Sequence, residues 1–171
     1  SDKWSVANLR YFNPVGAHHS GFMGENPIGE KNNIFPIILD VASKKIEKFE
    51  IYGDKWPTHD GTGVRDYIHV MDIAESHLKT LEYLFNNKSK LINLNLGTGK
   101  GTSVLELIYL FQETNSVSIP YKISNKRPGD VPIVVANNKL AFNVLNWRPK
   151  RSLEDICRDG WKFRLNYPNG Y

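Results

Sequence analysis

The sequence predicts an α/β fold, and three observations lead to this expectation. Short apolar segments such as 5–12 and 91–96 alternate along the chain with segments whose apolar residues recur every three or four positions. This alternation of strand and helix patterns is typical of α/β proteins. With 171 residues, of which 40% are hydrophobic and 23% charged, the chain is large enough and apolar enough to form a packed core.

In the first half, a helix is expected to begin after Asn33, because asparagine is a favourable N-cap and Pro36 then falls in the first turn. Its apolar face is formed by Ile34, Ile37, Ile38 and Val41. The other elements expected here are strands at 5–12 and 49–52, an extended segment at 64–70, and loops at 13–31 and 53–63. A loop as long as 13–31 is often functional.

In the second half, a helix is expected from about Asp72, with Ile73, Leu78, Leu81 and Leu84 at core spacing. Further helices are expected to follow Ser103 and Ser152, which are favourable N-caps, and the latter is followed by an acidic residue three positions on. The remaining elements expected are strands at 91–96, 121–124 and 133–136, a glycine turn at 97–101 and a short helix at 138–145.

Composition narrows the function classes. No run of about 18 apolar residues occurs, so no membrane-spanning helix is expected. The single cysteine, Cys157, is expected to be buried in a helix, rules out an intrachain disulfide and favours a cytoplasmic location. The net charge of +4 favours anionic partners. Nucleic acid is not expected among them, because the basic residues are neither clustered nor interleaved with aromatic residues.

Two apparent motifs do not carry the chemistry that they suggest. In Gly97-Thr-Gly-Lys-Gly101, Lys100 is followed by glycine rather than by serine or threonine, so the phosphate-binding P-loop pattern fails. The dinucleotide pattern also fails, because Thr102 stands where its third glycine is required. The adjacent His18 and His19 are expected to point apart in extended backbone, and no metal site is expected.

Two arginines in glycine-containing loops are better candidates for a binding site. Arg65 and Arg127 each present a planar guanidinium that matches phosphate oxygens, so together they could clamp a diphosphate. The helix that begins at Asn33 would add backbone donors, and Tyr52 could stack on a base. An ordinary surface salt bridge is the alternative for either arginine.

Longer motifs resemble the UDP-glucose 4-epimerase family, a part of the extended short-chain dehydrogenase superfamily. The most specific runs are Leu9-Arg-Tyr-Phe-Asn-Pro-Val-Gly-Ala-His18 and Asp60-Gly-Thr-Gly-Val-Arg-Asp-Tyr-Ile-His-Val-Met-Asp72. Further similar runs are 95–106, Arg127-Pro-Gly-Asp130, Asn146-Trp147 and Tyr167-Pro-Asn-Gly-Tyr171. The resemblance extends over essentially all of residues 1–171.

The resemblance implies that 1–171 is the UDP-sugar-binding C-terminal portion of such a protein, with the NAD-binding Rossmann half absent. In the family reaction, NAD removes hydride from C4 of the hexose and returns it to the opposite face, which interconverts UDP-galactose and UDP-glucose. The family's catalytic Tyr-x-x-x-Lys pair is missing, because no tyrosine here has a lysine four residues later. Isolated, the chain is therefore expected to be inactive; a non-catalytic nucleotide-sugar-binding or interaction protein is the alternative.

Individual roles also follow from the resemblance. It implies that Phe12 lies by the nicotinamide, Asn13 contacts the sugar and its phosphate, Asn33 and Ile34 approach the diphosphate, Glu50, Ile51 and Tyr52 line the uracil, Arg65 and Arg127 bind the diphosphate, and Asp130 binds the ribose. Val134 stands where many bacterial members carry tyrosine, so we expect room for N-acetylated sugars. Self-association through exposed strand edges is also expected, because unpaired edges invite pairing.

Overall fold

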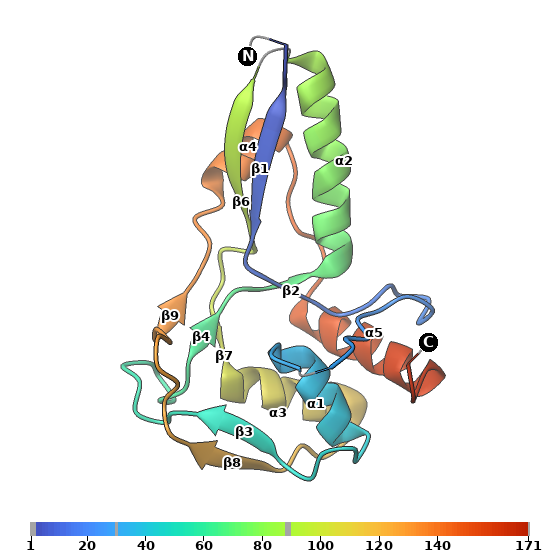
Figure 1. The fold of residues 1–171 in the computed structure, drawn as a ribbon, viewed down its shortest axis with the longest axis vertical. Helices are drawn as coiled ribbons and strands as arrows, with labels where there is room; N and C mark the ends of the chain where they lie inside the picture. The colour runs from blue at the N-terminus through green and yellow to red at the C-terminus, as the bar shows by residue number, and fades with distance from the viewer. Residues whose placement is uncertain (1–2, 30, 88–89, 171) are drawn as a thin grey trace.

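The computed structural model describes residues 3–29, 31–87 and 90–170, which form nine strands and five helices in an elongated α/β arrangement (Figure 1). The α/β expectation is thus confirmed. A narrow part at one end contains β1 (Val6–Tyr11), β6 (Leu91–Leu96), α2 (Val70–Asn86) and α4 (Lys139–Leu145). A broader part contains α1 (Ile34–Ala42), α3 (Val104–Asn115), α5 (Leu153–Asn166), β3 (Phe49–Tyr52) and β8 (Tyr121–Ser124).

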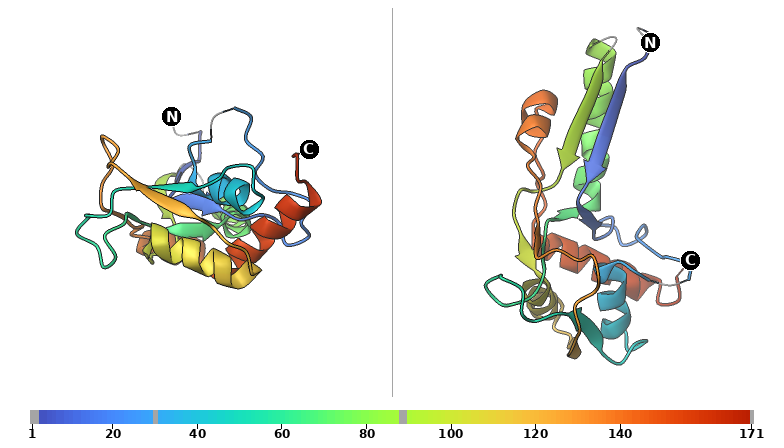
Figure 2. Two further views of the ribbon diagram at one scale, coloured as in Figure 1. Left: turned by 90° about the horizontal axis from the view of Figure 1, so that it is seen from below. Right: turned by 60° about the vertical axis from the view of Figure 1, so that its left-hand side comes forward.

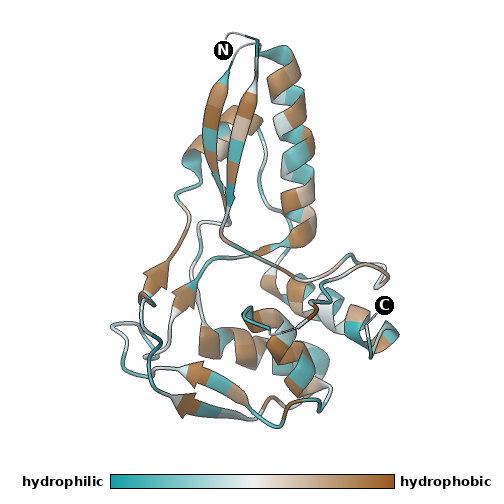
Figure 3. Ribbon diagram, viewed as in Figure 1, coloured by the Kyte–Doolittle hydropathy of each residue, from teal (hydrophilic) through white to brown (hydrophobic). Residues whose placement is uncertain are grey.

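The narrow part is built on a two-stranded parallel sheet. Strands β1 and β6 pair from Val6 opposite Leu91 to Tyr11 opposite Leu96, and they run side by side against α2 in the right-hand view of Figure 2. Leu94 and Leu96 are buried against α4, whereas Asn95 between them is only partly buried and Asn93 before them is exposed, as strand alternation requires. Figure 3 shows hydrophobic residues on both strands and along α2.

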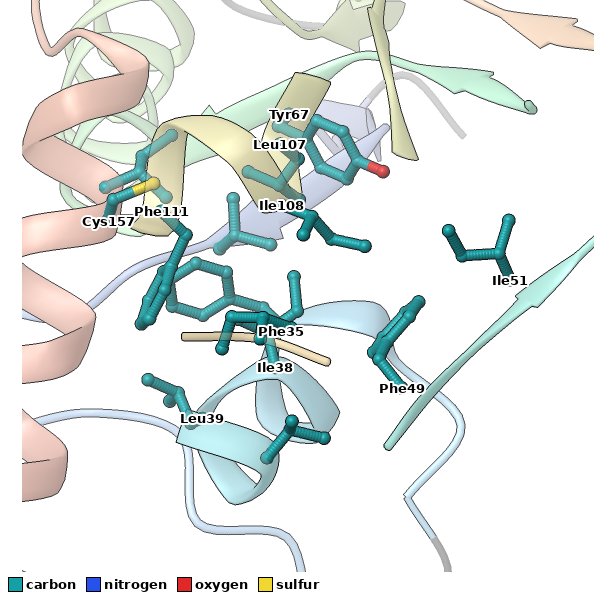
Figure 4. Close-up of a cluster of buried hydrophobic side chains, with 14 residues drawn as sticks. Phe35, Ile38, Leu39, Phe49, Ile51, Tyr67, Leu107, Ile108, Phe111 and Cys157 are labelled. Atoms are coloured by element: carbon teal, nitrogen blue, oxygen red, sulfur yellow. The ribbon is translucent and has the colours of Figure 1, made fainter. Parts of the chain in front are cut away.

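The broader part contains the larger hydrophobic core (Figure 4). Phe35 and Ile38 of α1 meet Phe111 of α3, and the Phe35 and Phe111 rings pack edge to face with centroids 6.0 Å apart. Cys157 enters this core from α5, and burial raises the pKa of its thiol to about 12. The sheet of β3 and β8, which is parallel, covers another side through Phe49 and Ile51, so α1, α3, α5 and β3 enclose one core.

Short strands connect the two parts. They are β2 (Asn13–Val15), which pairs with β5 (Tyr67–His69), and β4 (Val64–Arg65), which lies between β7 (Thr102–Ser103) and β9 (Ile133–Val134). The buried carboxylate of Asp66 accepts hydrogen bonds from the backbone of Thr98, Gly99 and Ala136 and from the Thr98 hydroxyl. Asp66 thereby ties the glycine turn to the segment that precedes α4.

Both serine caps are confirmed. Ser103 and Ser152 accept hydrogen bonds from the third residue of α3 and α5 respectively, and Glu106 and Asp155 return hydrogen bonds to the cap backbone. Each reciprocal arrangement is a capping box that satisfies amide donors at the helix start.

One helix begins slightly earlier than expected, and two local expectations were wrong. Helix α2 begins at Val70, because His69 caps it by accepting a hydrogen bond from the amide of Met71. Leu78 and Leu81 are 62% and 51% exposed, since the narrow sheet and α4 cover only part of the helix surface. Segment 13–31 was expected to be a loop but includes β2, which the parallel partner β5 stabilises.

The histidine expectation also needs correction. The rings of His18 and His19 lie with centroids 4.2 Å apart instead of diverging. The amide of Gly21 donates to the carbonyl of His18, so the backbone turns here rather than continuing in extended form. Among the described residues, no three His, Cys, Asp or Glu side chains form a potential metal site. No helix in the same part of the chain has both the length and the apolar character needed to span a membrane.

Candidate functional site

A cavity of about 740 Å³ lies in the broader part of the molecule, next to its core. Most of its wall comes from residues 12–15, 31–34, 48–52, 63–67 and 127–130, which are far apart in sequence. The sequence-predicted residues that line it are Phe12, Asn13, Asn33, Ile34, Glu50, Ile51, Tyr52, Arg65, Arg127 and Asp130. Val134 is not part of this wall: it lies in β9, paired in register with Arg65 of β4.

Arg65 is held in a defined position by the strands around it. Its Nη1 donates to the carbonyl oxygens of Val64 and Val131 at 2.9 and 3.0 Å, and its Nη2 lies 3.9 Å from Oδ1 of Asp130. A guanidinium carries five N–H donors, so these contacts orient the group and leave donors for a ligand. The salt-bridge alternative and the binding role are therefore compatible at Arg65.

Arg127 makes a different kind of contact. Its guanidinium carbon lies 3.6 Å from the ring centroid of Tyr52, a cation–π arrangement. The Tyr52 hydroxyl donates to Oε2 of Glu50 at 2.9 Å, and Lys122 pairs with Oε1 of the same carboxylate at 2.5 Å. The hydrogen bond from Lys122, followed by that from Tyr52, lowers the pKa of Glu50. The hydrogen bond to Glu50 thus orients Tyr52, and Arg127 stacks on its ring.

The start of α1 forms part of the wall through Asn33 and Ile34. Asn33 is its N-cap, as expected, but its side chain does not cap the helix and donates instead to Oε1 of Glu25 at 3.2 Å. The first turn of α1 contains no acidic residue of its own, and the nearby Glu25 carboxylate bonds to the Asn33 side chain. Such a helix start favours an anionic ligand group.

A buried ion-pair cluster joins two wall residues, Lys31 and Asp40, to α5. Asp40 of α1 pairs with Arg164 of α5 at 2.5 Å and with Lys31, and only 5% of the Asp40 and Arg164 side chains is exposed. Burial acts to raise the pKa of Asp40, but the hydrogen bonds from Lys31 and Arg164 outweigh it, so the pKa is lowered. The cluster fixes Lys31 at the cavity, where its charge is already compensated by Asp40.

Tyr67 and Phe12 complete the wall near the strand junction. Burial raises the pKa of Tyr67, and the nearby charge of Arg65 offsets only part of this effect. Its phenol therefore stays protonated at neutral pH and can donate a hydrogen bond. Phe12 is partly buried, and its amide donates to the carbonyl of Leu96 at 3.1 Å, which places an apolar ring between β1 and β2.

Sequence reasoning missed Lys31, Asp40, Trp56 and Tyr67 in this wall. Only Trp56 carried a usable signal, since it follows the candidate base-stacking residue Tyr52 by four residues in the expected loop 53–63. Asp40 lies outside the apolar face expected for its helix, and its partner Arg164 lies more than a hundred residues away. Taken together, the wall combines two arginines, a helix start and aromatic rings, which suits a phosphorylated ligand with a planar ring system.

Comparison with known proteins agrees with this class of site. Residues 1–160 match the family described as GDP-mannose 4,6 dehydratase, and the chain belongs to this family. Within it, the chain is similar to UDP-glucose 4-epimerases. It is 46% identical over 170 residues to the enzyme of Bacillus subtilis and 46% identical over 173 residues to that of Drosophila melanogaster. These alignments cover 99% and 100% of the chain but only 50% and 49% of the relatives.

Solved structures give the same result. UDP-glucose 4-epimerase from Stenotrophomonas maltophila, solved with NAD and formylated UDP-arabinopyranose, matches with a TM-score of 0.94 and 46% identity over 97% of this chain and 49% of its own. The enzyme from Bifidobacterium longum, solved with NAD+ and UDP, matches with a TM-score of 0.95 and 39% identity over 100% of this chain and 50% of its own. The chain therefore spans about half the length of the relatives it matches, and the epimerase resemblance is confirmed.

Proposed function

We propose that this chain forms the nucleotide-sugar site of a UDP-glucose 4-epimerase and binds UDP-galactose and UDP-glucose. The observation that carries the proposal is the placement of Arg65, Arg127, the start of α1 and Tyr52 around one cavity of about 740 Å³. This volume lies within the range of small-molecule sites. In the proposed complex, the arginines and the α1 amides bind the diphosphate, Tyr52 and its strand neighbours line the uracil, and Asp130 accepts from the ribose.

We further propose that NAD and the proton-transfer residues come from sequence that the relatives carry beyond the matched length. NAD would accept hydride from C4 and return it to the other face. This chain contributes Phe12, whose apolar ring suits contact with the nicotinamide, and Asn13, which would contact the sugar and its phosphate. Residues 1–171 would act as one C-terminal substrate-binding portion. With added NAD, the isolated chain is expected to leave UDP-galactose unchanged, and measurable epimerisation would overturn this part of the proposal.

Titration calorimetry with UDP tests the binding role. We expect saturable binding that Arg65→Ala weakens about tenfold or more, since a hydrogen bond to a charged group contributes about 1.5–3 kcal/mol. Arg148→Ala is the matched control, because it removes the same charge from a side chain that stacks on Phe142, away from the cavity wall. Absence of binding at millimolar UDP, or equal weakening by both variants, would contradict the proposal.

We also propose that the small Val134 leaves room for N-acetylated sugars. The side chain lies in β9 beside the wall residue Arg65 rather than in the wall itself, so tyrosine at this position would have to reach over that strand to narrow the site. Comparing the affinities for UDP-galactose and UDP-N-acetylgalactosamine in the wild type and Val134→Tyr tests this. Strong exclusion of the N-acetylated sugar by the wild type would count against it.

A non-catalytic interaction role is the second candidate, and exposed apolar surface on the narrow part favours it. Trp4, Leu91 and Phe85 are 72%, 70% and 80% exposed, and β1 has no partner on its outer edge among the described strands. We propose that this edge supports self-association in the cytoplasm. A monomer at all concentrations in sedimentation equilibrium would contradict it.

A further inference from the structure

The loop between β8 and β9, residues 125–132, is joined to the end of β3 and to the segment that follows it by two adjacent cation–π contacts. Lys126 Nζ lies 3.9 Å from the ring centroid of Trp56, and the guanidinium carbon of Arg127 lies 3.6 Å from that of Tyr52. Two consecutive cations thus meet two aromatic rings that are four residues apart. The same loop carries Asp130, which together with Arg127 lines the cavity.

The two contacts are built differently. Lys126 Nζ also donates to the carbonyl oxygen of Lys55 at 3.0 Å, and Trp56 Nε1 donates to the carbonyl oxygen of Tyr52 at 3.3 Å. Gly53 has a φ of +86° and lies so close that a Cβ would come within 2.6 Å of Lys126 Cγ and 2.8 Å of Trp56 Nε1. The absence of a side chain at this position therefore lets Lys126 and Trp56 pack against the backbone.

The Arg127 side chain has fewer contacts than that of Lys126. Within the part of the chain that the structure describes, its side chain has the Tyr52 stack and makes no hydrogen bond or ion pair. The loop around it is exposed, and a Cβ at Gly129 would meet nothing within 4 Å. Lys126 is consequently the anchor at the β8 end of the loop, whereas Arg65 holds the β9 end through the Val131 carbonyl. The Arg127 guanidinium between them can leave Tyr52 at the cost of one cation–π contact.

We propose that Lys126 is a positioning residue for nucleoside diphosphate binding. By packing on Trp56 and bonding to the Lys55 carbonyl, it holds loop 125–132 beside the cavity, so that Arg127 and Asp130 are in place before the ligand arrives. Ordering this loop in advance lowers the conformational entropy lost on binding. Arg127 then exchanges the Tyr52 ring for a phosphate, which frees that ring face for the base. This inference rests on the proposed nucleotide-binding function.

Calorimetric titration of the 171-residue chain with UDP tests the inference. Lys126→Ala is expected to weaken binding about two- to fivefold, the range that one exposed cation–π contact supports. Lys55→Ala is the matched control, because it removes an equal charge from the neighbouring exposed residue and keeps the backbone carbonyl that Lys126 uses. Lys126→Arg is expected to restore affinity, since arginine also stacks on indole rings and donates hydrogen bonds.

A double-mutant cycle separates positioning from direct contact. In an Arg127→Ala background, Lys126→Ala is expected to lose the part of its effect that acts through Arg127, because one of the two groups that it positions is gone. Equal weakening by Lys55→Ala and Lys126→Ala would show a general charge effect and overturn the inference, as would a full Lys126→Ala effect without Arg127. If the wild type binds UDP and Lys126→Ala binds equally well, only this inference fails. If the wild type binds no UDP, the proposed function is wrong, and the inference that rests on it is wrong as well.

Discussion

Replacement of Asp66 by asparagine should destabilise the whole molecule, because this carboxylate joins three segments. Its Oδ1 accepts from the amide and the hydroxyl of Thr98 at 2.9 and 2.6 Å, and its Oδ2 accepts from the amides of Gly99 and Ala136 at 2.9 and 3.1 Å. Asparagine keeps one acceptor oxygen and places an NH₂ group at the other position. With the NH₂ group at the Oδ2 position, the amides of Gly99 and Ala136 would face a donor; at the Oδ1 position, the amide of Thr98 would.

The expected cost follows from the surroundings of these donors. Ala136 is buried, so its unpaired amide should cost about 1–3 kcal/mol. Gly99 is exposed, so water can accept a hydrogen bond from its amide and reduce the cost there. We therefore expect Asp66→Asn to lower the free energy of unfolding by about 2–4 kcal/mol. The space cannot relax easily, because a Cβ at Gly97 would lie 2.6 Å from Asp66 Oδ2 and 2.5 Å from Ala136 Cβ.

Urea unfolding followed by circular dichroism measures this change. The exposed Asp54→Asn serves as the control and should change the free energy of unfolding by less than about 0.5 kcal/mol. A loss below about 1 kcal/mol for Asp66→Asn, with an unchanged dependence on urea, would refute the view that this carboxylate ties the three segments together.

Three further predictions concern the core and the helices. Because Lys31 and Arg164 lower the pKa of Asp40, the ionised Asp40 should stabilise the fold above the ordinary aspartate pKa of about 3.9, and this stabilisation should be lost as the pH falls below that value. The free energy of unfolding of Asp40→Asn should lack this pH dependence, and identical acid-unfolding curves for the variant and the wild type would contradict the prediction. Burial raises the pKa of Cys157 to about 12, so a thiol reagent should modify it only after unfolding in urea, and rapid modification of the native chain would disprove this. Ser152→Ala removes the cap of α5 and should cost about 1 kcal/mol in urea unfolding, and an unchanged midpoint would show that the cap is dispensable.

Local patterns were sufficient where the governing interaction is itself local. The alternation in 91–96 predicted β6 with its observed bounds, and Ser103 and Ser152 predicted capped helices, because a strand pattern and a capping box each depend on a few neighbouring residues. Leu78 and Leu81 show the limit of the same method. Their spacing was helical, but whether that face is buried depends on how much of α2 the neighbouring elements cover.

In the candidate site, too, some features follow from the sequence and others only from the tertiary structure. The sequence by itself determined the elements and the residue types: two arginines in loops, the start of a helix at Asn33 and an aromatic ring at Tyr52, together with motifs long enough to indicate the family. Tertiary structure alone decided that these groups share one cavity and that Val134 lies outside its wall. It also decided the contacts of Lys126 with Trp56 and of Asp40 with Arg164. The physical reason is that cation–π contacts and ion pairs depend on distance in space, and these partners are brought together only when distant segments pack.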